Sequence, residues 1–508
     1  MSASPYDTYT SPLASRNASP AMLRLWSPRH KFNTWRRIWL AVAQAQHQLG
    51  LPVSEEQVEQ LRAVVERKNP DGTVGITDDE IRLAEKYERD LRHDVMAHVH
   101  ALGDSCPEAK GIIHLGMTSQ DVVCNADLLI LRDSLFLIGE KIDRAVFAFG
   151  EFARSHHDLP TLGYTHYQPA QPLTVGRRAV QWAYELDLSH ENLRERAAEI
   201  VCGGRGLKGA TGTQASFLAL LGGERARVDE LESRFMKSLF DNDTDWHDMY
   251  QFTGQTYPRL HDTIVLSRLA TVAAVLHKIA TDIRLLSNRK ELDEPFEDKQ
   301  IGSSAMPYKR NPMRCERICG LTRFVMNLVG NAYDTAATQW LERTLDDSSN
   351  RRLSLPEAFL ALDGALDLMH NVASGLIVHE AMVRRNLMAE LPFMATENIL
   401  MECVKLGGDR QHYHELIRVH AQAAGHRVKH EGLDNDLLER LRNDRAFWSA
   451  ARGGPLAAEL NWDGVLDPMK YVGRSVEQTE RFIREVVEPL RERYKDELES
   501  LDDSGPRV

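Results

Sequence analysis

Hydrophobic positions recur along most of this chain with the 3.6-residue period of a helix, and they do so over unusually long stretches. The period is kept through residues 127–155, 175–200, 258–289, 313–340 and 356–378. Since a helix rises 1.5 Å per residue, each of these segments predicts a helix of about 30–45 Å. Helices of this length usually pack side by side, so the pattern predicts a bundle.

Two further helices are predicted before the bundle, and each has a recognisable start. Ser27-Pro28 is typical of an N-cap followed by proline at the first helical position, and apolar residues then recur at helical spacing up to Gly50. Thr77 with Glu80 three residues later predicts a capping box and a second helix. Both signals extend the helical prediction to the N-terminal part.

Alternation of polar and apolar residues, which would predict strands, is scarce. The segment LPTLGYTHYQPAQPL (159–173) contains three prolines and is interpreted as an extended or irregular connection rather than a sheet. The predicted class is therefore all-α. Because single cores rarely extend past about 250–300 residues, we expect three domains: an N-terminal helical domain (1–117), a central long-helix bundle (118–378) and a C-terminal helical domain (379–508).

The charge of the chain narrows the kind of ligand. A formal net charge of −12 provides no basic surface of the kind that binds nucleic acid, so phosphate recognition would require a local cluster of arginines. The N-terminus lacks the apolar core of a signal peptide, and no stretch approaches the roughly 18 apolar residues of a membrane span. We expect a soluble protein that binds a small anion.

Cysteine and histidine patterns predict neither a disulfide framework nor a metal site. The six cysteines form no CxxC pair, which fits a reducing cytoplasm. His93, His98 and His100 lack the i, i+4 spacing that places two ligands on one helical face. The run GRGLKG (204–209) matches GxGxxG, but a charged helical segment precedes it where a dinucleotide site needs a strand, so it is interpreted as a loop.

The segment GSSAMPYKRNP (302–312) interrupts the helical pattern with two prolines and several polar groups. One interpretation is an ordinary helix connection. Alternatively, Ser303 or Ser304, beside amide donors and Lys309, acts as a base, and Lys309 stabilises the resulting oxyanion. Asn311 with the following proline is expected to cap the next helix. The residues alone leave open which serine is the base.

A candidate acid lies elsewhere in the chain. His166 follows Thr165 in the irregular segment, and Glu316 is on the first turns of the helix after the loop, where a carboxylate can orient an imidazole. The plainer alternative for His166 is a hydrogen-bonded structural histidine. Two long predicted helices separate His166 from Ser303 in sequence, and we expect neighbouring chains to bring the two together.

A series of motifs in one order along the chain resembles the adenylosuccinate lyases of eukaryotic type, within the fumarase/aspartase superfamily. The motifs are TSPLASR, KFNTWRRIWL, RHDVMAHVH, GIIHLGMTS, LPTLGYTHYQPAQPLTVG, KGATGTQASF, TGQTY, GSSAMPYKRNP, ERTLDDSSNRR and ELPFMATENI. The resemblance implies three mostly helical domains and a homotetramer whose long helices form a shared bundle. It also implies elimination of fumarate from the nucleotides adenylosuccinate and SAICAR, without a metal or other cofactor.

The resemblance assigns roles position by position. It implies Ser303 as general base, His166 as general acid and Glu316 as the partner of the histidine, with Lys309 and Asn311 near the succinyl carboxylates. His93 is counted with the catalytic residues as well as with the binding residues. The implied substrate-binding positions are Arg16, Asn17, Arg92, His93, Asp94, Thr118, Ser119, Gln255, Asn311, Arg317, Arg343, Ser348 and Arg352. Asn17 stands where this family has tyrosine.

Other functions remain open from the sequence. Argininosuccinate lyase and aspartase share the loop signature, although RHDVMAHVH and ERTLDDSSNRR favour the adenylosuccinate branch. A catalytically silent structural relative would not need Ser303, His166 and Lys309 together. A regulatory nucleotide-binding protein would need the arginines without the acid and the base.

Overall fold

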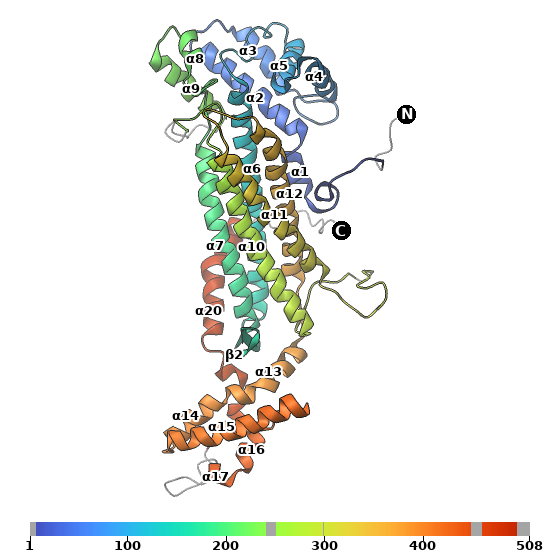
Figure 1. Cartoon of the computed structure of the whole chain (residues 1–508), viewed down its shortest axis with the longest axis vertical. Coiled ribbons are helices and arrows are strands. Elements are labelled where there is room, and N and C mark those ends of the chain that lie inside the picture. The colour runs from blue at the N-terminus through green and yellow to red at the C-terminus, as the bar shows by residue number, and fades with distance from the viewer. Residues whose placement is uncertain (1–6, 240–249, 298, 449–459, 495–508) are drawn as a thin grey trace.

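The computed structural model describes residues 7–239, 250–297, 299–448 and 460–494. The molecule is elongated, with a central helical bundle, a group of N-terminal helices at one end and a group of C-terminal helices at the other (Figure 1). In the described ranges the strands are confined to two short antiparallel pairs. The all-α prediction is confirmed.

The N-terminal part consists of short helices that begin at the predicted caps. They are the π-helical turn η2 (Leu13–Asn17), α1 (Pro20–Leu25), α2 (Pro28–Gln48), α3 (Glu55–Val65), α4 (Asp78–Leu91) and α5 (Asp94–Ser105). Ser27 Oγ accepts a hydrogen bond from His30 N at 3.2 Å, and Thr77 and Glu80 form the predicted capping box. Helix α4 ends at Arg92, whose φ of 56° turns the chain directly into α5.

The bundle is built from long helices linked by short strands and loops. Its elements are α6 (Ser119–Ser155), β1 (Pro160–Thr165), β2 (Gln168–Thr174), α7 (Val175–Cys202), α10 (Leu260–Asn288), β3 (Leu292–Asp293), α11 (Met313–Ala337), α12 (Asp346–Gly375) and β4 (Ile377–Val378). Trp182 Nε1 donates to Asp282 Oδ2 at 2.8 Å and Arg268 Nη1 donates to Asn192 Oδ1 at 2.7 Å, so α7 and α10 run antiparallel.

The remaining helices flank the bundle at both ends. Between α7 and α10 lie α8 (Ala215–Leu220) and α9 (Arg225–Leu239). The C-terminal helices are α13 (Glu380–Met394), α14 (Thr396–Lys405), α15 (Arg410–His426), η4 (Arg427–Glu431), α16 (Leu437–Asn443), α17 (Arg445–Trp448), α19 (Trp462–Val465), η5 (Pro468–Lys470), α20 (Ser475–Phe482), η6 (Ile483–Val487) and α21 (Glu488–Arg493).

The described residues form three apolar cores that match three units of structure, but the residues of each core are not contiguous in sequence. The N-terminal core recruits α8 and α9, through Phe217 and Phe235 among others. Helices α20 and α21 return to the bundle core, where Phe482 and Leu490 are buried, and leave the C-terminal core to residues 395–465. The domain boundaries predicted at 117 and 378 therefore stay predictions, and two segments, α8–α9 and α20–α21, pack against a core on the other side of the predicted boundary.

The segment predicted to be irregular is a β-hairpin. β1 pairs antiparallel with β2, and His166 and Tyr167 form a two-residue turn with φ values of 52° and 56°. Turns of this type usually contain Asn or Gly, because both central residues need positive φ. The prolines misled the prediction, since a two-stranded ribbon consists only of edges, where a missing N–H is tolerated.

Helix α12 begins ten residues before the predicted start at position 356. Pro356 lies inside the helix instead of opening it. The first turn is fixed by buried ion pairs, in which Arg259 Nε lies 2.8 Å from Asp347 Oδ2 and Arg351 Nε lies 2.6 Å from Asp262 Oδ2. These tertiary contacts outweigh the helix-ending signal of the proline.

One described helix, α10, is long and apolar enough to cross a membrane by length and composition, contrary to the sequence expectation. Half of its most apolar window is buried inside the chain. Its side chains at Leu269, Leu276 and Ile283 are fully buried in the bundle core. A buried core helix passes the same test of length and composition, so this finding is weak evidence for a membrane span.

Candidate active site

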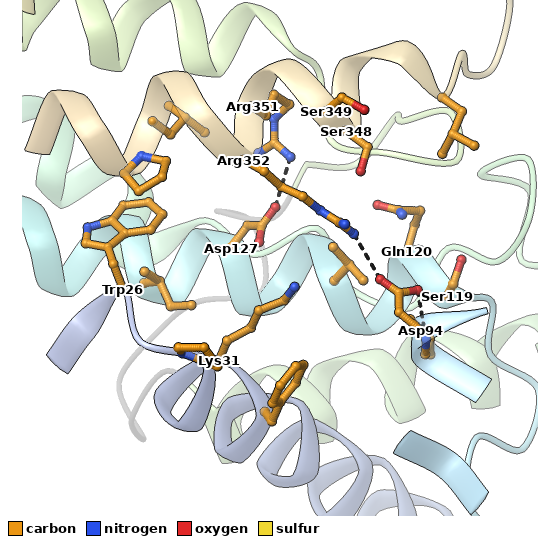
Figure 2. A pocket seen from close by; sticks show the side chains of 18 of the residues that line it. Trp26, Lys31, Asp94, Ser119, Gln120, Asp127, Ser348, Ser349, Arg351 and Arg352 are labelled. Carbon is orange, nitrogen blue, oxygen red and sulfur yellow. Dashed lines mark hydrogen bonds and ion pairs between the residues drawn. The ribbon is translucent and has the colours of Figure 1, made fainter. Parts of the chain in front are cut away.

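A cavity of about 750 Å³ opens where the bundle meets the N-terminal helices. It lies between α2, α5, the start of α6 and the first turns of α12, as Figure 2 shows. Seven of the predicted substrate-binding residues line it: Arg92, His93, Asp94, Ser119, Arg343, Ser348 and Arg352. Three segments distant in sequence, 92–94, the start of α6 and 343–352, thus bring these residues to one cavity.

The α4–α5 junction contributes the RHD motif. His93 is the N-cap of α5, and its Nδ1 accepts a hydrogen bond from Met96 N at 3.2 Å, which places the proton of the neutral ring on Nε2. Asp94 accepts from Val95 N at 2.8 Å and from Arg352 Nη2 at 2.9 Å. Burial raises the pKa of Asp94, but these donors and the charge of nearby Lys31 outweigh it and hold the pKa below its ordinary value.

Neighbouring arginines at the start of α12 have different environments. Arg351 extends into the core, where it contacts Asp262, Tyr257 and Asp127. The side chain of Arg352 is 61% exposed and reaches across the cavity to Asp94 (Figure 2). Arg351 therefore fixes the helix, and this leaves Arg352 available to an anionic ligand.

Thr118 and Gln255 lie beside the cavity rather than on its lining. Thr118 is the N-cap of α6, immediately before Ser119. Gln255 Oε1 accepts a hydrogen bond from Arg343 Nη1 at 2.8 Å, and Gln255 N donates to Glu342 O at 3.0 Å. Burial lowers the pKa of Arg343, which remains a cation at neutral pH. Gln255 thus orients one of the arginines of the cavity.

Sequence reasoning missed Lys31, the first residue of the motif KFNTWRRIWL. Its side chain points into the cavity (Figure 2), and its Nζ lies 4.8 Å from the ring centroid of Trp35. Burial, followed by the charge of Arg352, lowers the pKa of Lys31. Its position beside the Trp35 stripe does not by itself show whether a lysine faces a cavity or solvent. Gln120 and Asp127, on the same side of α6, also line the cavity and were not predicted.

The loop 302–312 and the start of α11 lie outside this cavity. Ser303 Oγ accepts a hydrogen bond from Met306 N at 3.2 Å, while Lys309 is exposed. Asn311 does not cap α11 as predicted, because its Nδ2 donates to Gly302 O at 2.9 Å. Buried Glu294 caps the helix instead, by accepting from Arg314 N at 2.9 Å and from Cys315 N at 3.1 Å.

The predicted residues on both sides of this loop also lie outside the cavity. Glu316 is exposed on the first turn of α11. Burial lowers the pKa of Arg317, and the positive charge of Arg16 adds to that effect. Arg16 and Asn17 belong to η2, and Asn17 Nδ2 donates to Pro12 O at 2.9 Å. Arg16 and Asn17 on η2 and Arg317 on α11 are also absent from the lining of the cavity.

His166 occupies the exposed turn of the hairpin. Its neighbour Tyr164 donates to Glu291 Oε1 at 3.4 Å, which holds the hairpin against the end of α10. Because α7 and α10 are antiparallel, His166 and Ser303 lie toward the same end of the bundle, so helix length alone does not separate them, contrary to the sequence argument. Their separation comes from the loop between α10 and α11, which projects sideways from the bundle and away from the hairpin (Figure 1).

Helix length does separate His166 from the cavity. Ser119 opens α6, whereas His166 lies beyond the other end of this 37-residue helix, about 55 Å away at 1.5 Å per residue. Among the described residues, the lining of the cavity includes neither His166 nor Ser303. One chain therefore does not bring the predicted binding residues together with the predicted acid and base.

No group of three His, Cys, Asp or Glu side chains among the described residues is arranged to hold a metal ion. The GxGxxG match begins directly after α7, which confirms that it follows a helix and not a strand. Five described cysteines are free and buried: Cys106, Cys124, Cys315, Cys319 and Cys403.

Comparison with known proteins shows similarity along nearly the whole chain. The family described as Lyase matches residues 15–327, and the family described as Adenylosuccinate lyase C-terminus matches residues 392–482. Adenylosuccinate lyase of Schizosaccharomyces pombe is 49% identical over 95% of both chains, and that of Saccharomyces cerevisiae is 48% identical over 98% of this chain and 99% of its own. Among solved structures, the 3-carboxy-cis,cis-muconate lactonizing enzyme of Pseudomonas putida matches with a TM-score of 0.74 and 25% identity, over 95% of this chain and 99% of its own.

Proposed function

Because this chain belongs to the adenylosuccinate lyase family, it is a carbon–nitrogen lyase, and we propose how its residues perform the reaction. The reaction eliminates fumarate from adenylosuccinate to give AMP, and from SAICAR to give AICAR. Both substrates carry a phosphate and two carboxylates. A site for them needs several cations and hydroxyl groups in one place.

The observation that carries the proposal is the charge of the cavity. In a chain of net charge −12, four cationic side chains face it: Lys31, Arg92, Arg343 and Arg352, while Arg351 borders it but is paired with Asp127 and Asp262. Three carboxylates, Glu88, Asp94 and Asp127, line it as well. The cavity is therefore a local cationic site inside an acidic protein, and we assign it to the anionic groups of the substrate, with His93, Thr118, Ser119, Gln255 and Ser348 as further ligands.

The elimination itself is assigned to the residues outside the cavity. Ser303 removes the proton from the carbon next to a carboxylate, and the resulting negative charge spreads into that carboxylate, where Lys309 and Asn311 stabilise it. The electron pair then forms the double bond of fumarate while the carbon–nitrogen bond breaks. His166, oriented by Glu316, protonates the departing nitrogen. Arg16, Asn17 and Arg317 complete the binding groups.

These residues meet when neighbouring subunits supply the missing segments. We propose a homotetramer in which the cavity of one chain receives the hairpin of a second and the loop of a third. The separation of Ser119 from His166 along α6 supports this arrangement, as does the exposure of His166 and Lys309 in the single chain. Exposed Tyr333 and half-exposed Phe324 on α11 provide apolar surface for contacts between chains.

We place the enzyme in the cytoplasm. The five described cysteines are free thiols, which fits a reducing compartment. We assign it neither nucleic acid nor membrane as a partner, in keeping with its acidic charge.

The direct test is to incubate the purified protein separately with adenylosuccinate, SAICAR and argininosuccinate and to follow the release of fumarate. Release from the first two and not from the third is expected. Release from argininosuccinate alone would assign the chain to that lyase, and release from none would favour a catalytically silent relative.

A further inference from the structure

The glycine-rich segment 204–209 has a role that its resemblance to a dinucleotide motif conceals. It lies inside the protein next to the start of α6, and its second residue, Arg205, is fully buried. A buried guanidinium is costly unless all its surroundings are arranged to receive it. Its partners therefore indicate what the segment holds in place.

Arg205 joins helix α6 to the loop around Gly254. Its Nη1 pairs with Asp121 Oδ1, and its Nη2 donates to Gly209 O at 3.0 Å and to Gly254 O at 3.1 Å. Asp121 is also fully buried, and its Oδ1 accepts from Lys208 N and Gly209 N at 3.0 Å each. The ion pair and these hydrogen bonds tie residues 205–209 to α6 and to the segment around Gly254.

Both ends of this network lead to residues assigned to the substrate. The second oxygen of Asp121 accepts from Thr118 N at 2.8 Å, which fixes the start of α6 directly before Ser119. On the other side, Gly254 precedes Gln255, which bonds Arg343 at 2.8 Å. In this network a single residue, Asp121 on one side and Gly254 on the other, therefore separates Arg205 from a residue assigned to substrate binding.

The backbone segments around Gly254 and Gly212 are packed too closely to move independently of their neighbours. A Cβ placed on Gly254 would lie 2.4 Å from Glu342 O, and one placed on Gly212 would lie 1.8 Å from Thr253 O. Glycine at both positions lets backbone meet backbone, so the peptide before Gln255 lies against the peptide before Arg343. A shift of either loop displaces both residues.

We propose that Arg205, through Asp121 and the Gly254 carbonyl, is a positioning residue that sets the distance between the Thr118–Ser119 side and the Gln255–Arg343 side of the cavity. The inference rests on the proposed function, because it assumes that Gln255 and Ser119 bind substrate. Arg205 itself touches no substrate. Its effect on catalysis passes through the start of α6 and the Gly254 loop, which it joins.

The test uses Arg205→Lys, which keeps the buried charge beside Asp121 but loses the planar fork that reaches three acceptors. Since misplacement by about 1 Å can cost about 100-fold, we expect kcat/KM for adenylosuccinate to fall about 10- to 100-fold. Combined with Gln255→Ala, the loss should be clearly smaller than the product of the two single losses, because both changes act on one unit. Arg36→Lys, at another buried ion pair with Glu80, is the matched control and should leave kcat/KM unchanged.

The outcomes separate this inference from the proposed function. Unchanged kcat/KM in Gln255→Ala would contradict the proposed binding role itself. A loss in Gln255→Ala, with kcat/KM of Arg205→Lys within twofold of wild type or with fully multiplicative losses, would overturn the positioning role alone. If Arg205→Lys does not fold, Gly254→Ala replaces it with the same readouts. Failure of both to fold, while Arg36→Lys folds, would show that the network maintains the fold and would also overturn the inference.

Discussion

Replacing Arg352 by alanine should weaken substrate binding strongly while barely changing stability. The guanidinium reaches across the cavity to Asp94, at 2.9 Å, with the two side chains 61% and 30% exposed. An ion pair this exposed contributes at most about 1 kcal/mol to folding. Its loss should lower the Tm by no more than about 2–4 °C.

The effect on binding is larger, because a phosphate or carboxylate would replace Asp94 as the partner of Arg352. A charge-assisted hydrogen bond of this kind contributes about 1.5–3 kcal/mol, so KM should rise roughly 10- to 100-fold. Steady-state kinetics with adenylosuccinate, together with a thermal melt, measures both quantities. Arg410→Ala, an exposed arginine at the start of α15, is the matched control and should change neither.

A particular pattern of results would refute this reasoning. If KM of Arg352→Ala stayed within twofold of wild type while the protein remained folded, Arg352 would not bind substrate. A fall in kcat at constant KM would instead place its contact in the transition state only.

Three further changes test other parts of the account. Ser303→Ala should remove nearly all turnover and leave substrate affinity nearly intact, as measured by single-turnover kinetics and equilibrium binding. Near-normal turnover in Ser303→Ala, together with an inactive Ser304→Ala, would show that the base is misassigned. Lys31→Met should raise KM about 10-fold with little loss of kcat, and an unchanged KM would make Lys31 a structural residue. Glu80→Gln should remove the part of the folding stability that depends on the ionised Glu80 carboxylate. Burial raises the pKa of Glu80, but Arg36, Ser105, Thr77 and Arg67 stabilise the carboxylate and lower its pKa to about 2. Since the folded pKa lies below the ordinary value, this contribution of about 3 kcal/mol to the free energy of unfolding is complete above pH 4.5 and is lost as pH falls toward 2. Urea unfolding at several pH values measures that free energy, which should fall less steeply with acid in the variant than in the wild type. An equal fall in both proteins would contradict the assignment.

The sequence predicted those parts of the fold that local patterns determine. The helices starting at Pro28 and Asp78 follow from their caps, and the bundle follows from long apolar periodicity. Prolines were less reliable, because they matter only where a backbone donor is needed. The prolines of the β1–β2 hairpin and Pro356 lie where none is required or where buried ion pairs compensate.

The candidate site was predicted largely by resemblance, and its geometry was not. No local pattern reveals that Arg351 faces the core while Arg352 faces the cavity, or that Glu294, distant by about 20 residues, caps α11 in place of Asn311. Lys31 was missed because a lysine beside an aromatic stripe has the same pattern whether it faces solvent or a cavity. Such contacts depend on the packing of distant segments.

The central claim is that a complete site takes residues from different chains, and subunit mixing tests it most directly. Purified His166→Ala and Ser303→Ala proteins, each nearly inactive, are dissociated, mixed in equal amounts and reassembled, with mixed tetramers confirmed by two affinity tags. If the histidine and the serine of a site come from different chains, about a quarter of the sites receive both intact. Mixing Ser303→Ala with Lys309→Ala should restore nothing, because both residues lie on one loop. We predict recovery of roughly a quarter of wild-type activity in the first mixture and none in the second; mixed tetramers of the first kind without any recovery would contradict the shared site.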